Sequence, residues 1–519
     1  MRRFLILFLF AALLASATSC TAATTTTTTA ASTATTATTV ETTTGTTTGA
    51  TTEPTTETTT ATTLDFAQIP VTAYATNNTM KLAAVSGISG WVDGSTGTIA
   101  VDDLIQYEAF KGTGAALTYA AAWVIDQSPQ RDEIIEYIFG EDGMRVQLVR
   151  LTVGASDFTT AAMGHYTYDD TVGNVADSDL SEFSIEKDRI IIEILKDALA
   201  INPDLIFMAA PWSAPAWMKT NKSLYGGTLS PSYYGMYSQY LIKYLDAYAA
   251  EGIDIDYLSV QNEPYYGPSD YPGMTWTIDT TKIFVRDFLG PDLEMVENDA
   301  KIMIWDHNPV DGSGNLIDFP VRVLRSEETA AYVDAIGVHC YSGDEVDMRN
   351  YLDYLYENNP EVEVFMTECT AVTTYTNLEQ NMEWSVRRMY IEAYNHHAVG
   401  TTYWNLALDA LGTTHLGGCG NCTGLVSVLS SSYRLEADGY VTAHFSRYVN
   451  VGARRIETDS ANANILVVGY LDDSGKITLV LWNDGAGRVA SILWRGKKCT
   501  VPLPANALVS VNWTIPTSE

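Results

Sequence analysis

Short apolar runs alternate with longer segments of helical periodicity from about residue 105 to residue 408. The runs are apolar at successive positions rather than at every second one, which is typical of parallel strands buried on both faces. They predict strands at 110–118, 146–153, 205–210, 255–260, 301–305, 335–339, 362–367 and 401–406. Amphipathic helices are predicted between them at 182–199, 231–250, 278–289, 344–356 and 378–395.

Repeated alternation of strand and helix indicates βα units, and eight strands predict a closed α/β architecture, the (β/α)8 TIM barrel, over residues 105–414. A doubly wound open sheet is the alternative. That fold would place a glycine-rich phosphate-binding turn after the first strand, and the sequence has none there.

The pattern changes after residue 415. Short β-rich runs at 465–470, 477–482, 489–494 and 508–513 follow one another, and an Asp-Asp-Ser-Gly turn at 472–475 separates two of them. We predict an appended β-sandwich over residues 415–519. Residues 64–104 are rich in Val, Thr and Gly and are expected to add N-terminal strands to it.

The N-terminus has the features of an export signal, predicted at residues 1–20. A positive Met-Arg-Arg start precedes an apolar run of about a dozen residues, too short for the ~20 that span a bilayer. Two outcomes are open: ordinary signal cleavage, or lipidation of Cys20 in a weak lipobox. The Thr/Ala-rich segment 21–63 is expected to form a disordered stalk, which favours a secreted or surface-anchored protein.

The formal net charge of −33 lies mainly outside the stalk. It argues against nucleic acid and anionic membrane surfaces as partners, whereas a neutral sugar would not be repelled. The sequence has no Gly-x-Ser-x-Gly elbow, no His-Glu-x-x-His motif and no phosphate loop. We therefore expect no cofactor and no catalytic metal; the oligomeric state is left open.

The six cysteines include one close pair, Cys419 and Cys422. With His415 nearby this pair could be half of a zinc site, but no second pair exists, so a small loop disulfide is favoured. Cys340 and Cys369 follow neighbouring predicted strands, and the sequence leaves open whether they form a disulfide or remain free thiols.

Two carboxylates end predicted strands. Glu263 follows the fourth and Glu368 the seventh. Since the carboxyl ends of barrel strands form the active-site face, we predict that the two acids meet across one cleft. A pair of carboxylates, one protonated and one ionised, is what glycoside hydrolysis requires. Aromatic and polar residues at other strand ends suit sugar rings and their hydroxyls, among them Trp212, His339, Tyr341 and Trp404.

Several longer motifs are specific. They are Gly154-Ala-Ser-Asp157-Phe, Tyr166-Thr-Tyr-Asp-Asp170, Pro211-Trp-Ser-Ala-Pro-Ala-Trp217-Met-Lys-Thr220, Gln261-Asn-Glu-Pro264, Thr367-Glu368-Cys and Trp404-Asn-Leu-Ala-Leu408. With them, the chain resembles glycoside hydrolase family 30 from about residue 106 to residue 455. That family includes glucosylceramidases and microbial endo-β-1,6-glucanases.

The resemblance implies a retaining mechanism with Glu263 as general acid/base and Glu368 as nucleophile. It implies sugar contacts in the −1 subsite from Asp157, Trp212, Asn262 and Trp404. By the same resemblance, Tyr341 would hydrogen-bond the nucleophile and His339 would line the pocket. A β-glucan or β-glucoside is the substrate it implies.

His339-Cys340-Tyr341 and the glycine-rich loop around Cys419 place the chain nearer the microbial β-1,6-glucanase branch. A glucosylceramidase-type enzyme or another exo-β-glucosidase or β-xylosidase is the alternative within the family. A non-catalytic cell-surface carbohydrate-binding protein is the alternative of another class. Lys111 departs from the family's usual first strand, where a glycine is common, and is expected either to pair with an acid or to alter the subsite.

Overall fold

The computed structural model describes residues 64–371 and 377–516. The predicted signal segment, Cys20 and the Thr-rich stalk lie outside these residues. None of the helices in the described ranges is long and apolar enough to cross a membrane.

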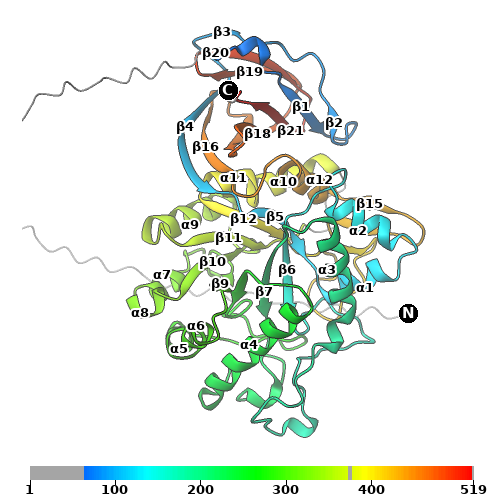
Figure 1. Cartoon of the computed structure of the whole chain (residues 1–519), viewed down its shortest axis with the longest axis vertical. Helices are drawn as coiled ribbons and strands as arrows, with labels where there is room; N and C mark the ends of the chain where they lie inside the picture. Colours follow the sequence, from blue (N-terminus) through cyan, green and yellow to red (C-terminus); the bar gives the residue numbers. More distant parts are fainter. Residues whose placement is uncertain (1–63, 372–376, 517–519) are drawn as a thin grey trace, which may run out of the picture. The chain divides into compact units, whose positions relative to one another are not determined.

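A closed barrel of eight parallel strands forms the larger part of the fold (Figure 1). In chain order its strands are β5 (Gly112–Ala116), β6 (Leu148–Val153), β7 (Ile206–Pro211), β8 (Tyr257–Ser259), β9 (Lys301–His307), β10 (Val333–His339), β11 (Glu363–Glu368) and β12 (Ala398–Tyr403). Strand β12 pairs with β5 and closes the ring. The predicted barrel and all eight of its strands are confirmed, and the open sheet is excluded.

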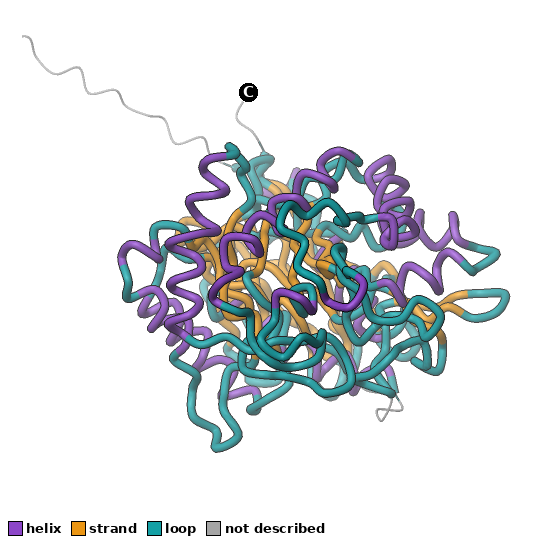
Figure 2. The backbone as a smooth tube through the Cα atoms, turned by 90° about the horizontal axis from the view of Figure 1, so that it is seen from below, coloured by secondary structure: helices purple, strands orange, loops and turns teal. Residues whose placement is uncertain are grey.

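Helices surround the strands, as the view along the barrel shows (Figure 2). They are α1 (Tyr119–Asp126), α2 (Arg131–Phe139), α3 (Arg189–Ile201), α4 (Tyr234–Ala250), α5 (Ile278–Phe284), α6 (Gly290–Met295), α7 (Phe319–Leu324), α8 (Glu327–Ala330), α9 (Glu345–Asn358), α10 (Leu378–Arg388) and α11 (Ile391–Asn395). The helix predicted over 378–395 is two helices. The chain breaks at Met389 and Tyr390, whose side chains are fully buried and whose dihedral angles are not helical.

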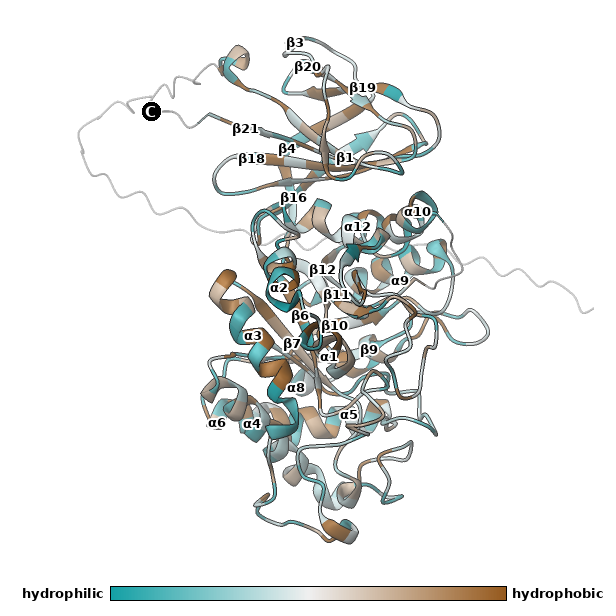
Figure 3. Cartoon of the chain, turned by 90° about the vertical axis from the view of Figure 1, so that its right-hand side faces the viewer, coloured by the Kyte–Doolittle hydropathy of each residue, from teal (hydrophilic) through white to brown (hydrophobic). Residues whose placement is uncertain are grey.

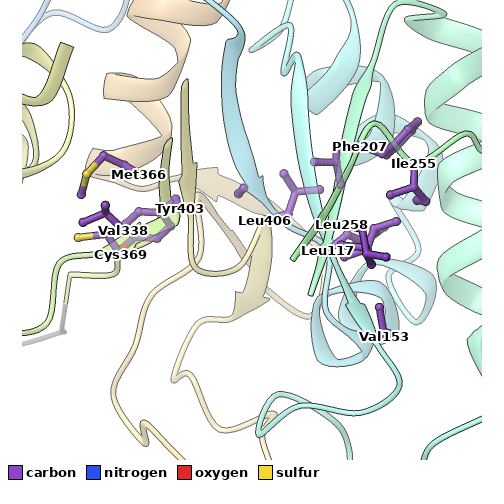
Figure 4. Packing of buried hydrophobic residues seen from close by; sticks show 14 of the residues in the cluster. Leu117, Val153, Phe207, Ile255, Leu258, Val338, Met366, Cys369, Tyr403 and Leu406 are labelled. Atoms are coloured by element: carbon purple, nitrogen blue, oxygen red, sulfur yellow. The ribbon is translucent and has the colours of Figure 1, made fainter. Parts of the chain in front are cut away.

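One continuous apolar cluster joins the outer faces of the barrel strands to these helices. Figure 4 shows Phe207, Ile255 and Leu258 in one part of it, and Val338 and Met366 in another. In Figure 3 hydrophobic residues, coloured brown, occur along the strands of the barrel. This packing holds the strands in place, so their carboxyl ends form a fixed rim.

The second sheet has ten strands in the order β2-β1-β21-β18-β17-β16-β4-β19-β20-β3. Their bounds are β1 (Thr72–Thr76), β2 (Ala83–Ala84), β3 (Val92–Asp93), β4 (Ile99–Ala109), β16 (Arg454–Ser460), β17 (Ile465–Leu471), β18 (Lys476–Asn483), β19 (Arg488–Trp494), β20 (Lys497–Leu503) and β21 (Ala507–Thr514). Trp494 on β19 packs against Trp513 on β21, which is not its hydrogen-bonded neighbour, with ring centroids 5.6 Å apart. The sheet thus folds over a single apolar core, as the predicted sandwich requires.

Both predicted ends of the barrel differ from the structure. Strand β4 belongs to the sandwich sheet and continues to Ala109, past the predicted boundary at 104. Residues 415–453 add no strand to that sheet. Instead β14 (Val426–Val428) and β15 (Tyr433–Leu435) pair with β13 (Ala407–Asp409), and α12 (Ala437–Ser446) packs on β5. These segments bury their apolar side chains in the same cluster as the barrel. The change of sequence pattern after residue 415 did not indicate this.

Lys111 lies at the amino end of β5, on the barrel floor. Its Nζ is 2.7 Å from Glu363, which begins β11. The expectation that it pairs with an acid is confirmed. Because the floor is the end opposite the strand carboxyl termini, this cation lies away from the predicted cleft.

Candidate active site

A cavity of about 520 Å³ opens at the carboxyl ends of the barrel strands. The predicted residues Asp157, Glu263, Tyr341, Glu368 and Trp404 line it. Trp212 stacks on Trp404, His339 contacts Glu263 and Glu368, and Asn262 directly precedes Glu263 in the chain. The structure therefore brings all eight predicted site residues together, although they come from six different strand ends.

Glu368 is the last residue of β11 and is buried. Its Oε1 accepts a hydrogen bond from the Tyr341 hydroxyl at 2.9 Å, as expected from the family resemblance. Its Oε2 accepts one from Nη1 of Arg150 at 2.7 Å. Two donors, one of them a permanent cation, thus fix this carboxylate in one orientation at the edge of the cavity.

Glu263 follows β8 and faces two imidazoles. Its Oε1 lies 3.2 Å from Nδ1 of His339 and 3.5 Å from Nδ1 of His307. Burial alone would raise the pKa of Glu263, but the hydrogen bonds and positive charge of the two histidines outweigh it and hold the pKa below the usual glutamate range.

His339 is fully buried and contacts carboxylates on both ring nitrogens. Nε2 lies 3.2 Å from Asp306, and Nδ1 lies 3.9 Å from Glu368 in addition to its contact with Glu263. Burial lowers the pKa of an imidazole, but here the neighbouring carboxylates, Glu368 first, raise the pKa of His339 to about 9. The imidazole therefore carries a proton between the two predicted catalytic acids.

Asp157 also lines the cavity and lies in the loop after β6. Burial and the negative charges of Glu368 and Glu263 raise its pKa well above the usual range. The raised pKa favours the protonated form of Asp157, which can both donate and accept hydrogen bonds and so suits a neutral hydroxyl-bearing ligand. The Trp212 and Trp404 rings stack beside it with centroids 5.4 Å apart, within a small apolar cluster on this side of the cavity.

One disulfide lines the cavity and a second joins residues adjacent in sequence to its lining. Cys419 and Cys422 are bonded, as favoured over a zinc half-site, and both line it. Cys340 and Cys369, left open by the sequence, are also bonded. Among the described residues Cys499 is a free, buried thiol. The loop around Cys419 approaches Asp157 so closely that a side chain at Gly418 would collide with the carboxylate.

Sequence reasoning missed Arg150. It lies in the middle of β6, is 1% exposed, and its Nη2 donates to Asn262 at 2.8 Å and to Asp306 at 3.0 Å. Asp306, at the end of β9, is a second site residue that the sequence did not single out. An arginine within a predicted buried strand was the available signal for this site. A buried cation is retained only where carboxylates compensate it, so Arg150 implied acidic partners on neighbouring strands.

Replacing Arg150 tests how much the site depends on this cation. Arg150→Met should lower the free energy of unfolding by about 3–5 kcal/mol, since the buried carboxylates of Asp306 and Glu368 would lose the permanent cation that they share. Urea unfolding measures the loss. Arg150→Met combined with Asp306→Asn should recover part of it. A single variant as stable as the parent protein would contradict the compensation argument.

Comparison with known proteins identifies the family. The model of the glycosyl hydrolase family 30 TIM-barrel domain matches residues 110–449. An endo-1,6-β-D-glucanase of Neurospora crassa is 31% identical over 386 residues, which cover 72% of this chain and 77% of that protein. A putative glucosylceramidase 2 of Caenorhabditis elegans is 30% identical, with coverage of 74% and 76%.

A solved endo-β-1,6-glucanase superimposes with a TM-score of 0.76 at 26% identity, covering 86% of this chain and 99% of the solved one. The match to the family model extends over more than half of the chain and includes every barrel strand. The chain belongs to glycosyl hydrolase family 30 and is an O-glycosyl hydrolase.

Proposed function

We propose that the chain is a retaining endo-β-1,6-glucanase with Glu368 as nucleophile and Glu263 as general acid/base. The observation that carries this proposal is the approach of both carboxylates to one imidazole, at 3.2 and 3.9 Å from Nδ1 of His339. Their Oε1 atoms are thus at most about 7 Å apart, compatible with the roughly 5–5.5 Å of retaining enzymes and at the short end of the roughly 6.5–9.5 Å of inverting ones.

The first step forms a covalent glycosyl–enzyme. Glu368 Oε1 or Oε2 bonds to the anomeric carbon, the glycosidic bond breaks, and the departing oxygen takes a proton from Glu263. In the second step Glu263 removes a proton from water, whose oxygen displaces Glu368 from the anomeric carbon. The configuration is retained because two inversions occur in sequence.

The acid step needs a proton on Glu263, whose pKa is held low while His339 is protonated. His339 lies 3.2 Å from Glu263 and can pass its proton to Oε1 when the substrate oxygen arrives. Asp306, on the other ring nitrogen, keeps the imidazole oriented for this transfer. We therefore assign His339 a proton-holding part in addition to lining the pocket.

Two observations support the β-1,6 linkage. The Neurospora crassa relative and the solved neighbour are both endo-β-1,6-glucanases, and the residues around Cys340 and Cys419 resemble that branch of the family. The glucosylceramidase-type relatives support the main alternative within the family. The raised pKa of Asp157 and the stacked rings of Trp212 and Trp404 suit an uncharged glycone for either branch of the family.

Chemical rescue tests the two roles. Glu368→Gly should abolish hydrolysis of an activated aryl β-glucoside, and azide should restore turnover with a glycosyl azide of inverted configuration. Glu263→Ala with azide should give a product of retained configuration, because the nucleophile is still present. Nuclear magnetic resonance of the products reads the configuration. The opposite pattern, or turnover of Glu368→Gly without azide, would refute the assignment.

A substrate panel tests the linkage. We expect release of short oligosaccharides from β-1,6-glucan, and rates at least about tenfold lower on β-1,3-glucan, xylan and glucosylceramide, since each 1.4 kcal/mol of lost transition-state binding is tenfold. Product sizing separates endo from exo action. Glucosylceramide as the preferred substrate would favour the alternative branch, and binding without turnover of any of these would favour a non-catalytic binding protein.

We also propose that the protein is exported, on the strength of its apolar N-terminal run and its two disulfides. The mass of the N-terminal peptide from the mature protein distinguishes simple cleavage from lipidation of Cys20. An intact residue 1 on the mature protein would contradict export by this signal.

A further inference from the structure

Three potential metal ligands converge at one side of the cavity. They are Glu263 after β8, His307 at the end of β9 and His339 at the end of β10, and their ligand atoms all lie within 4.8 Å of one another. In the described part of the chain this is the one such group of three. Nothing in the hydrolytic mechanism requires a metal there.

The spacing of these atoms fits a small tetrahedral ion. Glu263 Oε1 lies 3.2 Å from His339 Nδ1 and 3.5 Å from His307 Nδ1. An ion with bonds of about 2.0–2.1 Å at the tetrahedral angle has ligand–ligand edges of about 3.3–3.4 Å. Two of the three edges therefore already match. Glu263 and His307 line the cavity, so a fourth position is open to water.

The surroundings orient the ligands as metal sites require. His339 Nε2 contacts Asp306 at 3.2 Å, so once the proton between Nδ1 and Glu263 has left, the imidazole donates from Nε2 and offers the Nδ1 lone pair to an ion. Carboxylate–histidine–metal chains of this kind recur in zinc sites. Asp306 is itself fixed by Arg150 at 3.0 Å. Glu263, Asp306 and Glu368 all contact His339, at 3.2, 3.2 and 3.9 Å, and the permanent cation Arg150 contacts only the last two. This excess of carboxylates favours a positive ion at the position.

We propose that Glu263, His307 and His339 form a binding site for a divalent transition metal ion such as Zn²⁺, and that its occupation inhibits the enzyme. The ion takes a lone pair from each of Oε1 and the two Nδ1 atoms, and protons held between these atoms leave to water. Glu263 can then neither donate a proton to the substrate nor accept one from water. The inhibitory part rests on the proposed function; the binding part does not.

Calorimetric titration of the full protein with ZnCl₂ tests binding. We expect one ion per chain at this site, and His307→Gln should weaken it at least about tenfold, since loss even of an outer-shell partner costs roughly 10–100-fold. The matched control is His396→Gln, which removes another histidine that contacts two acids, Asp353 at 2.7 Å and Glu392 at 4.0 Å, away from the cavity. Zinc affinity lost in His396→Gln and kept in His307→Gln would overturn the proposal.

Initial rates with an aryl β-glucoside test inhibition. Zn²⁺ should lower kcat, because Glu263 bound to the ion can neither donate nor accept a proton, and a chelator should restore the rate. Full activity at zinc concentrations that saturate the calorimetric site would overturn the inhibitory part. Failure of the proposed function can be distinguished from failure of the metal site. The Glu368→Gly variant keeps all three proposed ligands and should still bind zinc. An inactive parent protein that binds zinc through His307 would therefore sink the hydrolase mechanism and leave the metal site standing.

Discussion

The buried guanidinium of Arg150 is the interaction on which the rest of the site depends. A cation that is 1% exposed in the wall of an apolar barrel is tolerated only with carboxylates in contact, and Arg150 has Asp306 at 3.0 Å and Glu368 at 2.7 Å. It also donates to Asn262. These partners come from β9, from β11 and from the segment after β8, so one side chain on β6 fixes three strand ends relative to each other.

The backbone is strained at several residues that follow or end the barrel strands. Glu263, Asp306 and Asn405 have φ values of 48°, 52° and 80°, in the left-handed region that costs a non-glycine residue on the order of 1–3 kcal/mol. Backbone hydrogen bonds between neighbouring strand ends hold them, such as Glu263 N to Asp306 O at 3.0 Å. At Gly337 a side chain would lie 2.9 Å from Asp306, so glycine there leaves space for the carboxylate. The packed barrel supplies the stability that this local cost requires.

The sequence predicted the barrel because buried parallel strands are apolar at every position, and it predicted Glu263 and Glu368 because polar residues at strand ends interrupt that pattern. Arg150 interrupts the apolar pattern in the middle of a strand, and a search for polar residues at strand ends does not find it. The pairing of Cys340 with Cys369 stayed open because two neighbouring strands bring the cysteines close without fixing the Cα separation and side-chain directions that a disulfide needs; the separation is 5.2 Å. The predicted domain boundaries at residues 104 and 415 were wrong. Local periodicity identifies a strand or a helix, but it does not determine which of two hydrophobic cores that element packs into.

The Cys340–Cys369 disulfide adds a second constraint on the proposed nucleophile, beside that of Arg150. Cys369 follows Glu368 directly, and Cys340 precedes Tyr341, whose hydroxyl donates to Glu368. Arg388 on α10 binds the carbonyls of Cys340, Ser342 and Gly343, so the loop that carries Tyr341 is fixed from outside as well. Both oxygens of Glu368 are therefore held by groups that are themselves anchored, one by an ion-pair network within the barrel and one by a covalent bond across its rim. A nucleophile fixed in this way needs little reorganisation before it attacks, which is how a rigid scaffold contributes to catalysis without contacting the substrate.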